Sequence, residues 1–127
     1  MNPPLILAVA VGGAIGSVAR YLVGIGAGRA FGGLLPWGTL IINVSGSALI
    51  GAFISLFAFR WSLPESARAF LTVGICGGYT TFSTFSLDAY YLIARGETVA
   101  AAIYMIASVI LSVGALIGAM HLVRAIG

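Results

Sequence analysis

Charged side chains are scarce in this sequence. The 127 residues include six Arg, no Lys and three acidic residues, so only 7% of the chain is charged. A soluble domain carries about 25% charged residues, and this shortage excludes an ordinary soluble fold. The six Arg are scattered near expected helix ends instead of forming a patch, which gives nucleic-acid binding little support.

Histidine and cysteine are each present only once. His121 lies within about two turns of the C-terminus, and Cys76 lies inside an apolar segment. A single thiol cannot form an intramolecular disulfide, and Cys76 is best interpreted as a small buried hydrophobic residue. Without a second Cys, a second His or any metal-ligand spacing, the sequence predicts that the protein is not an enzyme.

Acidic residues are almost absent from the apolar segments. Asp88 is the only carboxylate expected within a span. Proton-coupled carriers depend on Asp, Glu or His inside the membrane, so such a carrier is hard to build from this chain. We interpret Asp88 as a structural partner for an Arg or a hydroxyl near the membrane surface.

Apolar residues, in contrast, make up 61% of the chain, and its mean hydropathy is +1.13. At about 20 residues for each crossing, the length fits four transmembrane helices in one all-α domain with short loops. The first apolar stretch lacks a preceding basic region, so we interpret it as a span and not as a cleavable signal. The expected spans cover residues 5–25, 37–59, 67–94 and 99–123.

The third span contains a run that is poor in helix formers. Gly and hydroxyl residues occupy positions 77–84, which predicts a break near residues 77–81 between two half-helices that meet at the membrane midplane. Non-helical backbone at that depth is tolerated only inside protein or beside an aqueous cavity, so the break indicates a functional site. A helix that is merely kinked is the alternative.

Small residues recur at helical spacing in two other spans. Gly12, Gly16 and Gly24 are separated by multiples of four residues, with Arg20 on the same face, and Gly114 and Gly118 repeat the interval in the last span. Such faces allow helix backbones to approach closely. The spacing predicts tight packing without identifying the partner helix.

Neutral polar side chains form two stripes at intervals of four residues. The second span carries Thr39, Asn43 and Ser47, and the last span carries Tyr104, Ser108 and Ser112. Asn43 can donate two hydrogen bonds. Each stripe could line a polar path or could only hold helices together, and the spacing leaves both interpretations open.

Two aromatic residues follow the break. Phe82 and Phe85 share a helix face and have hydroxyl side chains beside them. Phe in a membrane helix usually faces lipid, but the edge of an aromatic ring is electropositive and can contact an anion. Neutral hydrogen-bond donors and aromatic ring edges together suit a site that attracts an anion without a full positive charge to neutralise it.

The basic residues are divided evenly between the two ends of the spans. Arg60, Arg68 and Arg124 are expected on one side, and Arg20, Arg29 and Arg95 on the other. This balance leaves the positive-inside rule without a preference, so the chain is expected to insert in both orientations. An antiparallel homodimer could then form, with both helix breaks at its two-fold axis.

Three groups of motifs follow one another along the chain. They are Gly12-Gly13-Ala14-Ile15-Gly16 leading to Arg20-Tyr21, Gly38-Thr39-Leu40 with Asn43 and Gly46, and Gly74 through Phe85 ending in Thr80-Thr81-Phe82-Ser83-Thr84-Phe85. In this order they resemble the motifs of the Fluc (CrcB) family of fluoride channels. The resemblance covers essentially the whole chain. It implies a dual-topology antiparallel homodimer with two pores in the bacterial inner membrane, surrounded by lipid, through which fluoride leaks passively out of the cytoplasm.

The resemblance also implies roles for individual residues. Asn43 would donate a hydrogen bond to fluoride, and Phe82 and Phe85 would present their ring edges to it. A polar track would be extended by Ser83, Thr84 and Tyr104.

Three further residues receive roles from the same resemblance. The backbone carbonyls of Gly77 and Thr80, from both subunits, would hold a structural Na⁺ at the dimer interface. Arg20 would lie in an aqueous vestibule and attract anions, although an anchoring role at the end of the first helix is equally compatible with the sequence.

A small multidrug or guanidinium exporter is the alternative function, because such exporters also have four short helices and dual topology. They require a carboxylate within the first helix for proton exchange, and this first helix has glycines and Arg20 instead. A membrane assembly subunit that transports nothing would leave the polar break without a role.

Overall fold

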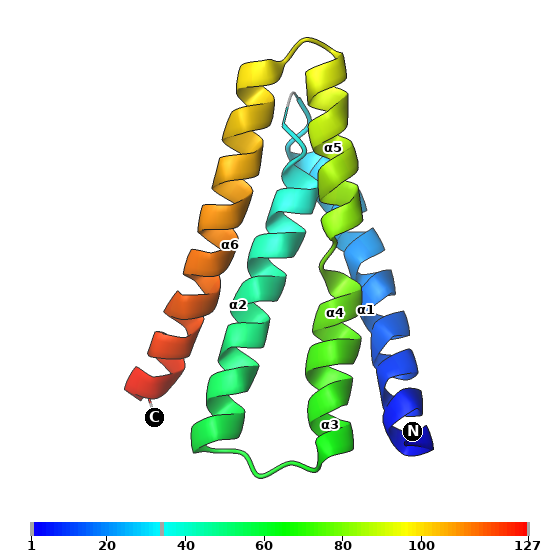
Figure 1. The fold of residues 1–127 in the computed structure, drawn as a ribbon, viewed down its shortest axis with the longest axis vertical. Helices are drawn as coiled ribbons and strands as arrows, with labels where there is room; N and C mark the ends of the chain where they lie inside the picture. The colour runs from blue at the N-terminus through cyan, green and yellow to red at the C-terminus, as the bar shows by residue number, and fades with distance from the viewer. Residues whose placement is uncertain (1, 34, 127) are drawn as a thin grey trace.

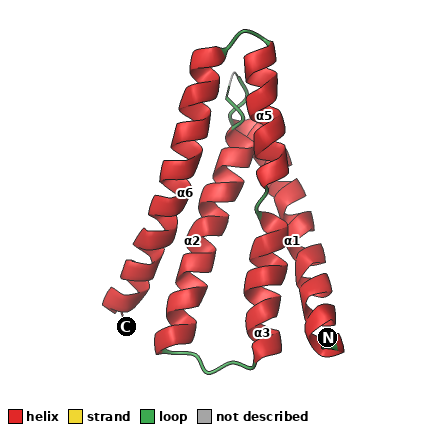
Figure 2. Ribbon diagram, in the orientation of Figure 1, coloured by secondary structure: helices red, strands yellow, loops and turns green. Residues whose placement is uncertain are grey.

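Most of the described chain is helical, with short loops between the helices (Figures 1 and 2). A computed structural model describes residues 2–33 and 35–126. The elements, in chain order, are α1 (Pro3–Ala30), α2 (Trp37–Phe59), α3 (Glu65–Ala69), the π-helical η1 (Phe70–Cys76), α4 (Gly77–Tyr79), α5 (Phe82–Ala94) and α6 (Thr98–Ile126).

Three of these helices are individually long and apolar enough to cross a membrane. They are α1, α2 and α6, with 28, 23 and 29 residues. The fourth apolar segment is made of α3, η1, α4 and α5 in succession, and we call it the interrupted segment (Figure 1). The expectation of an all-α membrane protein with four apolar segments is therefore confirmed.

Two helices extend beyond the spans expected from polarity. α1 continues to Ala30, where polarity predicted an end near Ile25, and α6 continues to Ile126, past the expected Val123. The Phe31 amide donates to the Ala27 carbonyl at 2.9 Å and closes the last turn of α1. A helix keeps its backbone hydrogen bonds after it leaves the hydrocarbon, so polarity marks the membrane boundary and not the helix end.

Both chain ends and the loop between α2 and α3 lie at one end of the molecule (Figure 1). Two contacts join α2 to α6 there. The Arg60 guanidinium donates to the Ile126 carbonyl at 3.3 Å, and the Arg124 guanidinium lies 5.3 Å from the centre of the Phe59 ring. Basic and aromatic side chains of this kind are typical of the headgroup layer.

Glycine contacts bring α1 against the interrupted segment. A Cβ atom on Gly12 would collide with the Phe70 carbonyl, and one on Gly16 would collide with the Ile75 carbonyl. The expected close approach of backbones is therefore present at Gly12 and Gly16. On α6, Cβ atoms on Gly114 and Gly118 would meet nothing within 4 Å among the described residues, so that face has no close partner within this chain.

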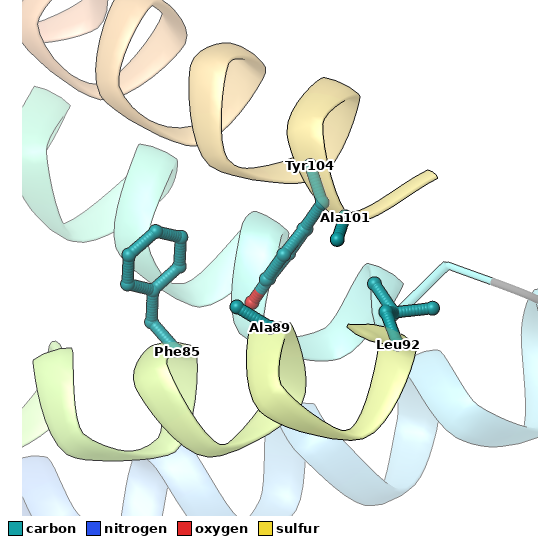
Figure 3. Close-up of a cluster of buried hydrophobic side chains, with 5 residues drawn as sticks. All are labelled: Phe85, Ala89, Leu92, Ala101 and Tyr104. Atoms are coloured by element: carbon teal, nitrogen blue, oxygen red, sulfur yellow. The ribbon is translucent and has the colours of Figure 1, made fainter. Parts of the chain in front are cut away.

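The α5–α6 hairpin contains the main cluster of buried apolar side chains (Figure 3). Its turn includes Gly96, whose φ of +81° lies in the left-handed region that glycine adopts without strain. The buried cluster consists of Phe85, Ala89, Leu92, Ala101 and Tyr104. It fixes α5 against α6 and so sets the position of the residues that begin α5.

Candidate functional site

The helical conformation of the interrupted segment stops at two residues. Thr80 and Thr81 have extended backbone, with φ and ψ of −79° and 158° and of −149° and 124°. Within the predicted break near residues 77–81, residues 77–79 form α4 and only Thr80 and Thr81 leave the helical conformation. A Cβ atom on Gly78 would collide with the Gly13 backbone, so α1 packs directly against this turn and holds it in place.

Threonine side chains satisfy several backbone groups at the two helix ends. The Thr80 amide and its hydroxyl both donate to the Cys76 carbonyl, at 3.1 and 3.0 Å. The Thr81 hydroxyl accepts from the Thr84 amide at 3.1 Å and caps the start of α5. Two consecutive Thr residues thus end one helix and begin the next.

Asn43 forms a pair of hydrogen bonds with the backbone of Thr81. Its Nδ2 group donates to the Thr81 carbonyl at 2.9 Å, and its Oδ1 atom accepts from the Thr81 amide at 2.8 Å. One of the two Asn43 N–H bonds is therefore used within the protein. The other N–H has no partner among the described residues and is the one available to an anion.

Arg20 also contacts the interruption. Its Nε group donates to the Gly78 carbonyl at 3.2 Å, in the last turn before the break. α1 continues past Arg20 to Ala30, so Arg20 does not mark the end of this helix. The guanidinium instead satisfies a carbonyl at the C-terminal end of a helix, where a cation is stabilised.

The predicted aromatic residues lie in one row. The ring centroids of Phe82 and Phe85 are 5.3 Å apart, and those of Phe85 and Tyr104 are 5.2 Å apart, both pairs tilted. Phe85 is 9% exposed and faces Tyr104 in the buried cluster (Figure 3), whereas Phe82 is 76% exposed. The structure thus brings the two Phe rings together, with Phe82 uncovered in the single chain.

Asp88 has a hydroxyl as its partner. The Tyr104 hydroxyl donates to Asp88 Oδ2 at 3.1 Å, across the α5–α6 contact. This pairing agrees with the structural role expected for Asp88. It also means that the hydrogen of the Tyr104 hydroxyl is already used by the carboxylate.

A cavity of about 670 Å³ lies between α2, the interrupted segment and α6. None of its lining residues, all of which the structure describes, carries a charge. Asn43, Phe82, Phe85, Gly77 and Thr80 are among them. The cavity therefore combines one amide, two aromatic rings and backbone at the break.

Not every predicted site residue reaches this cavity. Ser83, Thr84 and Tyr104 are not part of its lining, and neither is Arg20. The Ser83 hydroxyl lies 3.3 Å from the Thr81 hydroxyl, so Ser83 contributes to the local capping network. A polar track through Ser83 and Thr84 would thus run outside the cavity.

The serines that line the cavity belong to the two polar stripes. Ser47 lies one turn from Asn43, and Ser108 and Ser112 approach from α6. Ser108 is 6% exposed, and its hydroxyl has no hydrogen-bond partner in the part of the chain described. The four-residue spacing had indicated these serines, but spacing alone could not separate cavity lining from contacts between helices.

The break can be tested for its fit to the implied Na⁺. In the described residues, no hydrogen bond from outside the helices reaches the carbonyls of Gly77 or Thr80. The Thr81 amide would reach the Gly77 carbonyl in a continuous helix, but it donates to Asn43 instead. Carbonyl oxygens are suitable ligands for a hard cation, so the two residues fit the ion.

Comparison with known proteins finds one family along nearly the whole chain. A model of the family described as CrcB-like protein, Camphor Resistance (CrcB), matches residues 7–120. A protein of Nitrobacter winogradskyi named fluoride-specific ion channel FluC is 71% identical over 126 residues, which cover 99% of this chain and all of that protein. FluC 1 of Nitrobacter hamburgensis is 69% identical over 98% of both chains. FluC of Rhodospirillum centenum is 50% identical over 94% of this chain and 95% of its own.

Proposed function

The chain belongs to the CrcB-like family, and from this premise we propose that it is a channel that conducts fluoride passively through the cavity beside the helix break. The relatives are named fluoride-specific ion channels, so the function expected from the motifs is supported and the chain is not an enzyme. The alternative exporter would need a carboxylate in α1, where the chain has Arg20.

The observation that carries the proposal is the uncharged lining of the cavity. Fluoride holds its water strongly, so a pore must replace that water with hydrogen-bond donors. The free N–H of Asn43 and the serine hydroxyls offer donors, and the edges of Phe82 and Phe85 offer positive charge density. A fully charged partner would hold the ion too tightly for conduction.

Passive flow follows from the same lining. No acidic or histidine side chain lies along the cavity to carry a proton, so ion movement is not coupled to protons. Each fluoride then moves one negative charge across the membrane. In a bacterial inner membrane, the negative interior would drive fluoride out of the cytoplasm.

The complete pore is an assembly of two antiparallel copies. Three features of the single chain support it: the cavity is open to the exterior, Phe82 is exposed, and Gly114 and Gly118 have no close partner within 4 Å in the described chain. Because Arg20 lies within the bundle, Arg29 and Arg95 at one end oppose Arg60, Arg68 and Arg124 at the other. This near balance gives little bias in orientation.

The carbonyls of Gly77 and Thr80, from both copies, would hold a Na⁺ at the two-fold axis. Bound there, the ion would neutralise the partial negative charge of two helix ends that face each other. Each chain supplies the carbonyls by ending α4 at Tyr79 and leaving Thr80 extended.

The proposal is tested with purified protein in liposomes loaded with potassium fluoride. Fluoride efflux should be slow until a K⁺ ionophore relieves the voltage and should then rise steeply, because each ion carries charge. A matched preparation loaded with chloride should show little flux. Efflux driven by a pH gradient without the ionophore requirement would contradict a passive channel.

The antiparallel assembly has its own test. Two Lys residues added to the loop at Arg95, or two added to the loop at Arg60, should each fix one orientation and reduce activity. Coexpression of the two variants should restore fluoride flux. Full activity from one variant, with Cys accessibility showing a single orientation, would rule the arrangement out.

A further inference from the structure

Asn43 pairs with both backbone groups of Thr81, and this pairing does more than hold the amide in the pore. We propose that Asn43 is a positioning residue that keeps the helix break open and leaves the Gly77 carbonyl free for the structural cation. The inference rests on the proposed function, because the cation is part of it. Its geometry, however, is independent of fluoride.

The first step concerns the Thr81 amide. In a continuous α-helix it would donate to the carbonyl four residues earlier, which belongs to Gly77. Here it donates to Asn43 Oδ1 at 2.8 Å. Because the Thr81 amide donates to Asn43, the Gly77 carbonyl is left without its helical partner. The Asn43 side chain therefore determines whether the Gly77 oxygen is free.

The second step concerns how α2 comes close enough to reach the break. Gly46 is three residues beyond Asn43, and a Cβ atom on it would collide with the Thr80 methyl group. Only glycine at this position allows Thr80 to pack onto α2. The short Asn43 side chain can then reach both groups of Thr81.

The third step fixes the orientation of the Asn43 amide. Thr81 presents an N–H beside a C=O, so the Asn43 oxygen must face the N–H and the nitrogen must face the C=O. This cyclic pairing uses the amide hydrogen on the same side as Oδ1. The remaining hydrogen lies on the opposite side of the nitrogen, and Asn43 borders the cavity. One side chain therefore joins the break to the cavity.

The test compares Asn43→Leu, which keeps the side-chain shape but removes both polar groups, with Ser47→Ala one turn away. Two quantities are measured in detergent or nanodiscs: hydrogen exchange of the Thr81 amide, and the Na⁺ concentration that gives half of the maximal thermal stabilisation. In the parent, the Thr81 amide should exchange slowly with or without fluoride, and Na⁺ should raise the melting temperature.

In Asn43→Leu, the Na⁺ midpoint should rise at least about tenfold, because the Thr81 amide is released to compete for the Gly77 carbonyl. Thr81 exchange should accelerate, because the amide loses Asn43 Oδ1 as its acceptor. Ser47→Ala should change neither quantity. A Na⁺ midpoint equal to that of the parent would overturn the proposal, as would a parent that does not respond to Na⁺.

Gly46→Ala gives a second route if Asn43→Leu does not fold. It pushes Thr80 away from α2 without changing Asn43, and it should also raise the Na⁺ midpoint. Fluoride flux separates this inference from the proposed function. A parent that conducts no fluoride but shows the predicted exchange and Na⁺ effects would contradict the channel and leave the positioning role standing.

Discussion

The two sides of the interrupted segment are held by opposite means. On the α1 side, glycines at positions 12, 16, 74 and 78 let backbones touch, and the Arg20 side chain donates to the Gly78 carbonyl. On the α2 and α6 side, side chains make the contacts and leave a cavity of about 670 Å³. The α1 side depends on the absence of side chains, and the cavity side depends on particular polar and aromatic groups.

The contrast between the two sides explains how a helix break can exist within a membrane protein. Close packing on the α1 side fixes η1 and α4, because the glycines there let their backbones lie directly against α1, and the buried α5–α6 cluster holds the second half-helix. The other side can then use hydrogen bonds to satisfy the freed backbone groups and still present a donor to an ion. Changes in size should damage the first side, and changes in polarity, or added bulk at Gly46, should damage the second.

The largest effect is expected on the packed side. Gly16→Val should destabilise the protein by about 3 kcal/mol or more, because its Cβ would collide with the Ile75 carbonyl and no rotamer can relieve that contact. Thermal unfolding in detergent measures the loss. Gly13→Val is the matched control, because a Cβ there meets nothing within 4 Å, and it should be nearly neutral. Equal melting temperatures for the two variants would contradict the packed side.

An intermediate effect is expected where α5 meets α6. Tyr104→Phe leaves Asp88 Oδ2 without its hydroxyl partner and should cost about 1–3 kcal/mol of stability. In an Asp88→Leu background, the same change should cost much less, because no carboxylate remains to be satisfied. A double-mutant cycle measures the coupling. Purely additive effects would show that this hydrogen bond does not support the hairpin.

The smallest change in the free energy of unfolding is expected from replacing the aromatic rings. The same replacements should nevertheless lower fluoride conduction. Replacing Phe82 or Phe85 with Ile keeps an apolar side chain but removes the electropositive ring edge. Each change should lower fluoride conduction about two- to tenfold. Liposome flux measures this, with protein that still elutes as the assembled form.

Phe85→Ile should also lower stability slightly, since that ring packs on Tyr104 in the buried cluster. Phe57→Ile is the control, because Phe57 packs against Phe53 and Trp61 away from the cavity lining. If either cavity-side Phe variant conducts like the parent, that ring only fills space.

Sequence predicted the parts of this site that follow from composition and spacing. Apolar length located the four segments, and the Gly and Thr run located the break, although residues 77–79 stay helical. Gly77 and Gly78 are poor helix formers in isolation, but contact with α1 holds that turn. Helix propensity is measured without a neighbour, so it could not reveal this.

The contacts that complete the site could not be predicted. Asn43 and Thr81 are 38 residues apart, and Arg20 and Gly78 are 58 apart. Residues so far apart in the sequence meet only where the helices cross, and the periodicity of the sequence does not specify how helices cross. For the same reason, the stripe spacing could not show that Ser108 lines the cavity while Tyr104 faces Asp88.

The central claim is that this chain forms a passive, fluoride-selective pore, and current recorded from purified protein in a planar bilayer tests it most directly. With unequal fluoride concentrations and equal pH on the two sides, the current should reverse at the equilibrium potential of fluoride. Changing the pH on one side should leave that potential in place, and replacing fluoride with chloride should abolish the current. A reversal potential that follows the proton gradient, or an equal chloride current, would contradict the account.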